Sequence, residues 1–375
     1  MAMNTVKFEK LPDRLPPVNT VGWVAWVKQN LFGSVSNTII TLLFFYLMFL
    51  YIPPFLEWAV FNANISGSDR STCDENRSGA CWTFIKVRME QLLFGLYFAQ
   101  NPDQMWRPIM AFIVFGGLLT PLAIDRTPYK KWLLLILLVA YPIFFISLVG
   151  GGVFGIPKSD ASEWGGLLLT FTLAFVGIVL ALPLGILLAL GRRSKMPVVR
   201  SFSIIYIEFW RGTPLITILF MASVMLPLFF PSGVEFDKVV RAMIGITLFQ
   251  SAYTAEAVRG GLQAIDKGQT EASMALGMGY WQQTIFIILP QALRISIPSI
   301  VNTFIALFKD TSLVSIIGLL DLLKIAQNSS RSLDWNGYDI EAYMFAGLVF
   351  WIFCFGMSIY SQKLERKLDT DRNVE

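Results

Sequence analysis

Residues 256–280 read EAVRGGLQAIDKGQTEASMALGMGY, and the chain continues through Ile287-Ile-Leu-Pro290 into another apolar segment. Glycines at positions 260, 261, 268, 277 and 279 mark turns, whereas residues 269–276 contain good helix formers. We therefore expect a short surface helix between two membrane-spanning helices. A polar projection enclosed in this way by apolar segments is suited to docking of another polypeptide.

The segments on both sides of this stretch are strongly apolar. Of the 375 residues, 55% are hydrophobic and only 15% are charged, whereas about a quarter of the residues in a soluble domain carry charge. Runs of about 20 apolar residues satisfy their backbone groups in lipid only as helices. The sequence therefore predicts an all-α polytopic membrane protein with about eight transmembrane helices, near residues 36–52, 108–124, 132–149, 164–190, 202–230, 240–258, 283–308 and 343–360.

Several kinds of active site are excluded by composition. The chain has no histidine, so the Ser-His-Asp triad and the His-Glu-x-x-His zinc helix are absent. No segment fits Gly-x-x-x-x-Gly-Lys-Ser/Thr, the phosphate cradle of many ATPases. The formal net charge of +4 is too small to indicate nucleic-acid binding. We expect no catalytic residue, no metal site and no ATP bound by this chain itself.

Two of the three cysteines lie in one hydrophilic loop. Cys73 and Cys81 are separated by seven residues, whereas Cys354 lies in an apolar run. The pair can form a disulfide if the loop faces an oxidising compartment, and two free thiols fit the sequence equally well. A zinc site would need a second Cys or His pair.

The positions of Lys and Arg predict the orientation. With residues 1–35 as a cytoplasmic tail, the segments on the inner side carry most of the Lys and Arg residues in short loops. The amino-terminal part lacks the apolar core of a signal peptide. Both termini and the loop at 259–282 are then expected in the cytoplasm, where an ATPase could reach that loop.

The spacing within the loop is more specific than its composition. Glu271-Ala-Ser, then Gly277, then Ile287-x-Leu-Pro290 resembles the signature of the membrane subunits of ATP-binding-cassette importers, with Ser273 where the pattern has Ala. In that family the loop forms a coupling helix in a cleft of the ATPase. The resemblance assigns coupling to Gly268, Glu271, Ala272, Ser273, Gly277, Leu289 and Pro290. The alternative is an ordinary amphipathic helix on lipid headgroups.

Further segments resemble the permeases for polar and general L-amino acids. They are residues 208–214 (EFWRGTP), 252–261, 289–294 and 309–313 (KDTSL). The resemblance implies a five-helix core of type I importer topology at 164–366, preceded by three extra helices with an external loop at 36–150. It also implies the bacterial inner membrane, a cytoplasmic ATPase dimer carrying ATP-Mg, a periplasmic substrate-binding protein and a sister permease in a heterodimer. The sequence itself does not exclude a homodimer.

Four charged residues within the expected spans form two local pairs. Glu208 and Arg211 lie three positions apart, and Glu256 and Arg259 repeat the spacing, so each pair can neutralise itself on one helix face. We interpret them as structural ion pairs, the second one supporting the coupling helix. A gate or ligand role for Glu208 and Arg211 is the alternative.

Other polar residues are candidates for a substrate pathway. In transporters, broken helices near the membrane midplane expose backbone groups to small polar substrates, and Pro290 and Pro298 interrupt the seventh span. A cation, an anion and hydroxyl groups at its end would suit a zwitterion. The candidates are Gln250, Tyr253, Asn302, Thr303, Lys309, Asp310, Thr311 and Ser312. Helix-to-helix hydrogen bonding or a solvated external loop would explain them equally simply.

We therefore predict that the chain is the permease subunit of an ATP-driven L-amino-acid importer. An ion-coupled secondary transporter of a small polar solute is the alternative, but such folds usually contain inverted repeats, and the Glu271 loop has no second copy in this sequence. A membrane-embedded enzyme is disfavoured because histidine is missing and carboxylates are not clustered near a nucleophile.

Overall fold

The computed structural model describes residues 22–124, 127–152, 155–231 and 236–372. Regular structure in these ranges is helical, and pairing between extended segments is limited to isolated bridges. The prediction of an all-α fold is confirmed. Contacts divide the chain into two units, residues 1–67 with 71–82, and residues 68–70 with 83–375. Residues 1–21 of the expected cytoplasmic tail lie outside the described residues.

The first unit contains α1 (Trp23–Asn30), α2 (Val35–Leu56) and α3 (Ser71–Glu75). The first span, expected at 36–52, is longer than predicted, because Pro53 and Pro54 lie inside α2, which continues through a π-helical turn at Glu57–Phe61. The φ angle of proline is compatible with a helix, and in membrane helices neighbouring groups satisfy the freed carbonyls. The resulting apolar helix covers 27 residues.

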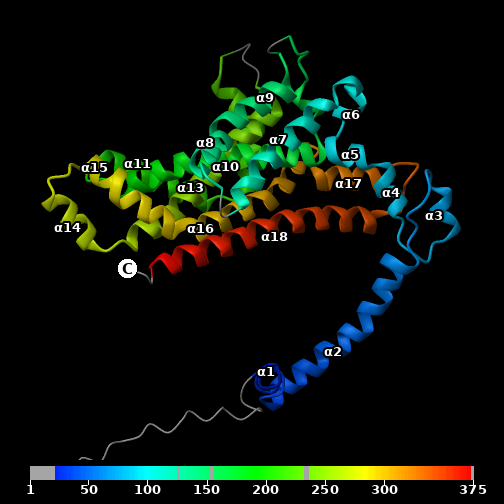
Figure 1. Cartoon of the computed structure of the whole chain (residues 1–375). Helices are drawn as coiled ribbons and strands as arrows, with labels where there is room; N and C mark the ends of the chain where they lie inside the picture. Colours follow the sequence, from blue (N-terminus) through cyan, green and yellow to red (C-terminus); the bar gives the residue numbers. More distant parts are fainter. Residues whose placement is uncertain (1–21, 125–126, 153–154, 232–235, 373–375) are drawn as a thin grey trace, which may run out of the picture. The chain divides into compact units, whose positions relative to one another are not determined.

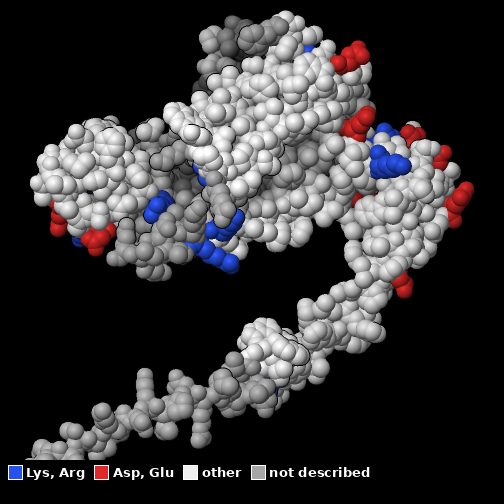
Figure 2. All heavy atoms as spheres, in the orientation of Figure 1, with Lys and Arg blue, Asp and Glu red and all other residues white. Residues whose placement is uncertain are grey.

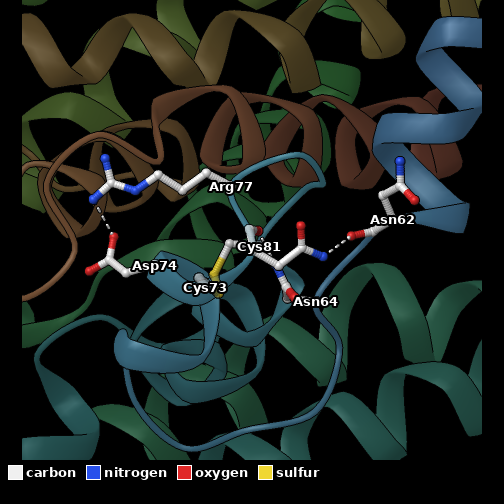
Figure 3. Close-up of a disulfide and its surroundings, with 7 residues drawn as sticks. Asn62, Asn64, Cys73, Asp74, Arg77 and Cys81 are labelled. Carbon is white, nitrogen blue, oxygen red and sulfur yellow. Dashed lines mark hydrogen bonds and ion pairs between the residues drawn. A yellow bond between two sulfur atoms is a disulfide. The ribbon is translucent and has the colours of Figure 1, made fainter.

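The loop after this helix is closed by the disulfide Cys73–Cys81 (Figure 3). Of the two alternatives left by the sequence, the structure has the disulfide, with the Cα atoms 5.7 Å apart. The backbone around it is hydrogen-bonded, since Asn64 N–H donates to the carbonyl of Ala80, and Ala80 N–H donates to that of Trp58, both at 2.8 Å. The loop is thus an ordered structure that requires oxidising conditions.

The second unit contains the remaining long helices, which α4 (Trp82–Val87) joins in sequence to the first unit. They are α5 (Met89–Phe94), α6 (Tyr97–Gln100), α7 (Trp106–Ala123), α8 (Lys130–Leu135), α9 (Tyr141–Gly150), α10 (Gly166–Arg192), α11 (Pro197–Gly212), α12 (Leu215–Phe220), α13 (Lys238–Gln263), α14 (Lys267–Ala275), α15 (Tyr280–Gln283), α16 (Leu289–Asp310), α17 (Leu322–Ser330) and α18 (Asp339–Arg372).

Small residues let the central helices approach closely. α13 packs against α10 and α16, and α16 lies beside α18 (Figure 1). A Cβ atom added at Gly185 would lie 2.7 Å from the Cβ atom of Thr254, and one added at Gly261 would lie 2.3 Å from the carbonyl oxygen of Ala292. Such contacts between small residues are the usual means of helix association in membranes, where lipid is as apolar as the helices.

The second and third expected spans pack onto α10 through aromatic rings. Tyr141 on α9 lies 5.4 Å, between ring centroids, from Phe115 on α7 and 5.2 Å from Phe175 on α10. Its hydroxyl donates to the buried carbonyl of Ala111 at 3.0 Å. Edge-to-face ring contacts stabilise by about 0.5–1.5 kcal/mol each beyond the buried area. These two extra helices are therefore part of the same packed unit as the core.

Six helices in the described ranges are long and apolar enough to cross a membrane, and α11 with the segment Leu215–Phe229 forms a bent seventh. The expected span at 202–230 corresponds to this bent pair, in which the chain turns by 103° after Gly212, where Pro214 precedes α12. α13, which covers the expected span 240–258, is too polar to satisfy the same criterion. Figure 2 shows that uncharged residues form most of the visible surface, with charged side chains in small groups.

Asp321 caps α17 from a fully buried position. Its carboxylate accepts the backbone N–H groups of Leu323 and Lys324 at 3.0 and 3.2 Å. Burial raises the pKa of this carboxyl from 3.8 to about 6, although the backbone hydrogen bonds act in the opposite direction. The folded protein therefore holds a proton on Asp321 more tightly than the unfolded chain does.

This pKa shift predicts a pH-dependent stability. Stabilisation by the proton on Asp321 is complete below pH 4 and is lost as the pH rises through about 6. The shift corresponds to up to about 3 kcal/mol. Asp321→Asn keeps a capping side chain without the ionisation. Between pH 5 and pH 8 the Tm of the native protein in detergent should fall relative to that of the variant, and parallel Tm curves would contradict the shift.

Candidate functional site

The helix expected at residues 269–276 is α14, which begins slightly earlier at Lys267. Asp266 caps it, accepting the N–H of Gly268 at 2.6 Å. At the other end Gly277 has a φ of +74°, Gly277 N–H donates to the carbonyl of Met274, and Met278 N–H donates to that of Ser273. This pattern is a Schellman motif, whose left-handed residue is usually glycine. Within this chain the space around Gly277 is open, so the positive φ of the turn is the local reason for the glycine.

The two faces of α14 differ in what they contact. Ser273 is 1% exposed, and its hydroxyl donates to the carbonyl of Thr270 at 2.8 Å. Glu271 and Ala272 are exposed, as the coupling role requires. Ser273 therefore belongs to the inner face and is not a docking residue in the structure.

Two exposed apolar side chains at α14 were missed by the sequence reasoning. Met274 is 56% exposed and Leu276 is 79% exposed. In the sequence they are ordinary members of a helical run, and only the direction of the side chains identifies them. An acidic residue with apolar neighbours on a short projecting helix is a surface that a protein partner can bury.

Leu289 and Pro290 lie in the first turn of α16, beyond the loop that contains α14; Leu289 is half-buried and Pro290 is exposed. A π-helical turn at Thr284–Ile288 precedes them, in which Leu289 N–H donates to the carbonyl of Thr284. Proline has no N–H and its ring clashes with the carbonyl four residues before it, so the helix widens at this point. The Ile-x-Leu-Pro part of the motif thus sets the shape of the segment that follows α14. We call this segment, from α15 through the π-helical turn to the first turns of α16, the α15–α16 arm.

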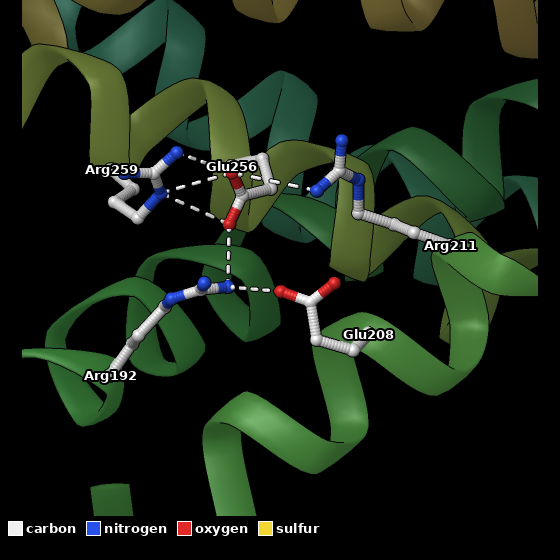
Figure 4. A network of polar contacts seen from close by, with 5 residues as sticks. All are labelled: Arg192, Glu208, Arg211, Glu256 and Arg259. Atoms are coloured by element: carbon white, nitrogen blue, oxygen red, sulfur yellow. Dashed lines mark hydrogen bonds and ion pairs between the residues drawn. The ribbon is translucent and has the colours of Figure 1, made fainter.

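A cluster of five charged residues joins three helices (Figure 4). Arg192, the last residue of α10, donates to Glu208 of α11 at 3.0 Å and to Glu256 of α13 at 2.9 Å. Arg259 also contacts Glu256, at 2.7 Å, and Arg211 lies 3.5 Å from the same carboxylate. The Glu256 carboxylate therefore forms ion pairs with three guanidinium groups. The cluster as a whole has three positive and two negative charges.

The pairing within the cluster differs in part from the expectation. The pair Glu256–Arg259 is present, with the charges three residues apart. The prediction of an ion pair between Glu208 and Arg211 was wrong. Among the described ion pairs, Glu208 contacts Arg192 and Arg211 contacts Glu256. Local spacing detects only partners on the same helix, and Arg192 comes from a helix that ends 16 residues earlier.

The side chains of the two pathway candidates on α13 face the interior of the protein. Gln250 is 3% exposed, and its side-chain nitrogen has no hydrogen-bond partner among the described residues. Tyr253 is half-buried, beside the guanidinium of Arg211 at 5.7 Å from the ring centroid. In the described part of the chain no hydrogen bond or ion pair links these two residues to the candidates on α16.

The candidates at the end of α16 divide into two groups. The hydroxyls of Thr303, Thr311 and Ser312 donate to backbone carbonyls three residues earlier, and Thr311 is fully buried. Asp310 is half-buried. Asn302 and Lys309 are exposed, seven positions apart, and so lie two turns apart on one face. They share this exposed face with Ser299 and Ala306, so from Ser299 to Lys309 it is small and polar, whereas the exposed Ile295 precedes it on the same side.

The sequence of the chain resembles those of known membrane proteins. Residues 181–370 match the family model described as binding-protein-dependent transport system inner membrane component. The chain is 50% identical over 361 residues to the inner membrane amino-acid ABC transporter permease protein YhdY of Escherichia coli K12, covering 96% of this chain and 97% of that protein.

Two further comparisons cover different parts of the chain. It is 40% identical over 437 residues to the glutamate/glutamine/aspartate/asparagine transport system permease protein BztC of Rhodobacter capsulatus, covering 98% of each. A crystal structure of an amino acid ABC transporter with histidines is 29% identical, covers 53% of this chain and 90% of its own, and has a TM-score of 0.47. The resemblance recognised in the Glu271 motif is confirmed. The chain belongs to the family of binding-protein-dependent transport system inner membrane components.

Proposed function

We propose that this chain is the permease subunit of an ATP-driven importer of L-amino acids, and that α14 is the helix on which the ATPase subunit docks. The observation that carries the proposal is the structure of α14. Its outer side presents Glu271, Met274 and Leu276, whereas its inner side is fixed through Ser273. A rigidly held, partly apolar projection is what a protein partner needs in order to exert force on the pathway.

The orientation proposed from Lys and Arg is supported by the disulfide. Cytoplasmic thiols are kept reduced, so the loop closed by Cys73 and Cys81 fits the periplasmic side. Between that loop and α14 the chain contains five crossings, if the bent pair and α13 each count as one. Because this number is odd, we propose that α14 lies on the opposite side, in the cytoplasm, with both termini.

Membership of the family supports our proposal for the partners. ATP-Mg is held by a separate ATPase dimer, and a periplasmic protein delivers the substrate. A sister permease supplies the second half of the pathway in a heterodimer, in the bacterial inner membrane. Membership of a binding-protein-dependent family favours this scheme over an ion-coupled transporter.

We propose that the exposed face of α16 lines the pathway. A helix that faces lipid usually presents large apolar residues, as α18 does with Leu348, Trp351 and Phe355. The α16 face instead carries Asn302 and Lys309 between small residues. A cation and an amide suit the carboxylate of an amino acid, and the names of the relatives indicate polar amino acids as the substrate class.

Substitution of this face tests the pathway proposal. In complexes reconstituted with the ATPase and the binding protein, Asn302→Ala and Lys309→Ala should each raise the KM for radiolabelled L-glutamate or L-glutamine by about tenfold or more, because a hydrogen bond to a charged group is lost. Asn328→Ala, at an exposed asparagine of α17, is the matched control. Transport at the native rate and KM in both variants would refute the assignment.

A further inference from the structure

Two glutamines reach from the α15–α16 arm to the coupling helix. Gln283, the last residue of α15, is 8% exposed and donates through Nε2 to the carbonyl of Thr270 at 3.0 Å. Gln291, in the first turn of α16, donates through Nε2 to Oε1 of Gln269 at 3.2 Å and to the carbonyl of Ile287 at 2.9 Å. Successive residues of α14 are thus held from two places on the arm.

The carbonyl of Thr270 collects two of these side-chain contacts. It accepts from Gln283 and also from the buried hydroxyl of Ser273 at 2.8 Å. A buried amide left without a partner would be costly, so this bond resists separation of the helix from the arm. The face of α14 opposite Glu271 is therefore anchored by hydrogen bonds and not only by apolar contact.

The π-helical turn explains why residues 283 and 291 face the same helix. Two turns of a regular α-helix take about seven residues, and a π-helical turn takes up one more. Residues eight positions apart are then brought back to one face, and Thr284–Ile288 supplies this turn between Gln283 and Gln291. Because Pro290 favours the widened turn, the Ile-x-Leu-Pro motif sets the register of both glutamines.

The chain on both sides of α14 contains glycine. Gly277 and Gly279 separate it from α15, and Gly260 and Gly261 lie in the last turns of α13. The link at Gly277 and Gly279 alone would let α14 tilt without moving α16, since glycine restricts the backbone little, whereas Gly261 packs against Ala292 of α16. The hydrogen bonds of Gln283 and Gln291 join α14 directly to the helices that follow it, in addition to apolar contact.

We propose that Gln283 and Gln291 are positioning residues that make α14 and the first turns of α16 move as one body when the ATPase subunits move. The inference rests on the proposed docking of the ATPase on α14. Motion of α14 is then carried along α16 to the face with Asn302 and Lys309, 11 and 18 positions beyond Gln291 in the same helix. Glu271 and its neighbours bind the partner, whereas the glutamines convert that binding into movement of the pathway.

The test separates binding from transmission. Complexes of the full-length chain with the ATPase and the binding protein are reconstituted in vesicles, with the substitutions Gln283→Ala and Gln291→Ala together. We expect the ATPase subunits to remain bound in the native ratio, and the amount of L-glutamate or L-glutamine transported per ATP hydrolysed to fall about tenfold, the effect of losing two hydrogen bonds. Gln263→Ala, at an exposed glutamine of the same loop, should leave that ratio unchanged.

A distance measurement supplies a second readout. Spin labels at Lys267 and Ile295, both exposed, report the separation of α14 from α16. The distribution of this distance should be narrow in the native complex and broader in the double variant. A native transport-to-ATP ratio or an unchanged distribution would overturn the inference. Loss of the ATPase from the double variant would also overturn it, because the glutamines would then serve docking, while the proposed function itself would stand.

Discussion

Glu271→Lys should abolish retention of the ATPase subunits while the permease still inserts normally in the membrane. Glu271 is exposed on α14 and has no ion-pair partner among the described residues, so its replacement leaves the fold of this chain intact. At a protein interface, replacing an attractive charge with a repulsive one costs several kcal/mol. We therefore expect the amount of ATPase that co-purifies with the tagged permease to fall at least about tenfold.

The matched control is Asp103→Lys, which changes the net charge equally at an exposed position in the turn before α7, on the side that we assign to the periplasm. This variant should retain the ATPase in full. Native amounts of bound ATPase and native uptake in the Glu271→Lys protein would contradict the docking role of α14.

Glu256→Gln should have the largest effect on stability. The substitution leaves three guanidinium groups with one carboxylate, in a cluster where the Glu256 side chain is only 15% exposed. Removal of one partner from a buried ion pair typically costs about 3–5 kcal/mol, and partial exposure of the arginines should reduce this to about 2–4 kcal/mol. Thermal unfolding in detergent should show a clearly lower Tm than that of the native protein.

Glu208→Gln is the control for this substitution. It removes the same charge from the same cluster, but Glu208 is 56% exposed and has one ion-pair partner, Arg192, in the described part of the chain. Exposed ion pairs contribute at most about 1 kcal/mol, so the Tm should change little. Equal losses in the two variants would show that Glu256 does not centre the cluster.

Much of the fold follows from patterns that lie close together in the sequence. Long apolar runs predict spanning helices, because lipid leaves the backbone few alternatives. α14 was predicted between its glycines, since capping by Asp266 and termination at Gly277 are local properties. The size of the bend at Pro214 and the continuation of α2 through Pro53 and Pro54 were not predicted, because a proline permits either outcome and packing decides.

The site was less predictable, because its contacts are between helices. The pair Glu256–Arg259 has helical spacing and was expected, whereas the bridge from Arg192 requires knowledge of how α10, α11 and α13 meet. The sequence motif assigns Ser273 to docking, but in the structure its side chain is buried on the inner face of α14. Gln283 and Gln291 gave no signal in the sequence, because the register between them depends on a π-helical turn.

Accessibility of α14 from the two sides of the membrane tests the central claim most directly. Ser273 is buried and unsuitable for labelling, so the cysteine is placed at the exposed Met274, in a chain with Cys354→Ser. A membrane-impermeant thiol reagent should label Met274→Cys only in inside-out vesicles, and added ATPase should protect it. Labelling of this position in intact cells would place α14 outside and contradict the account.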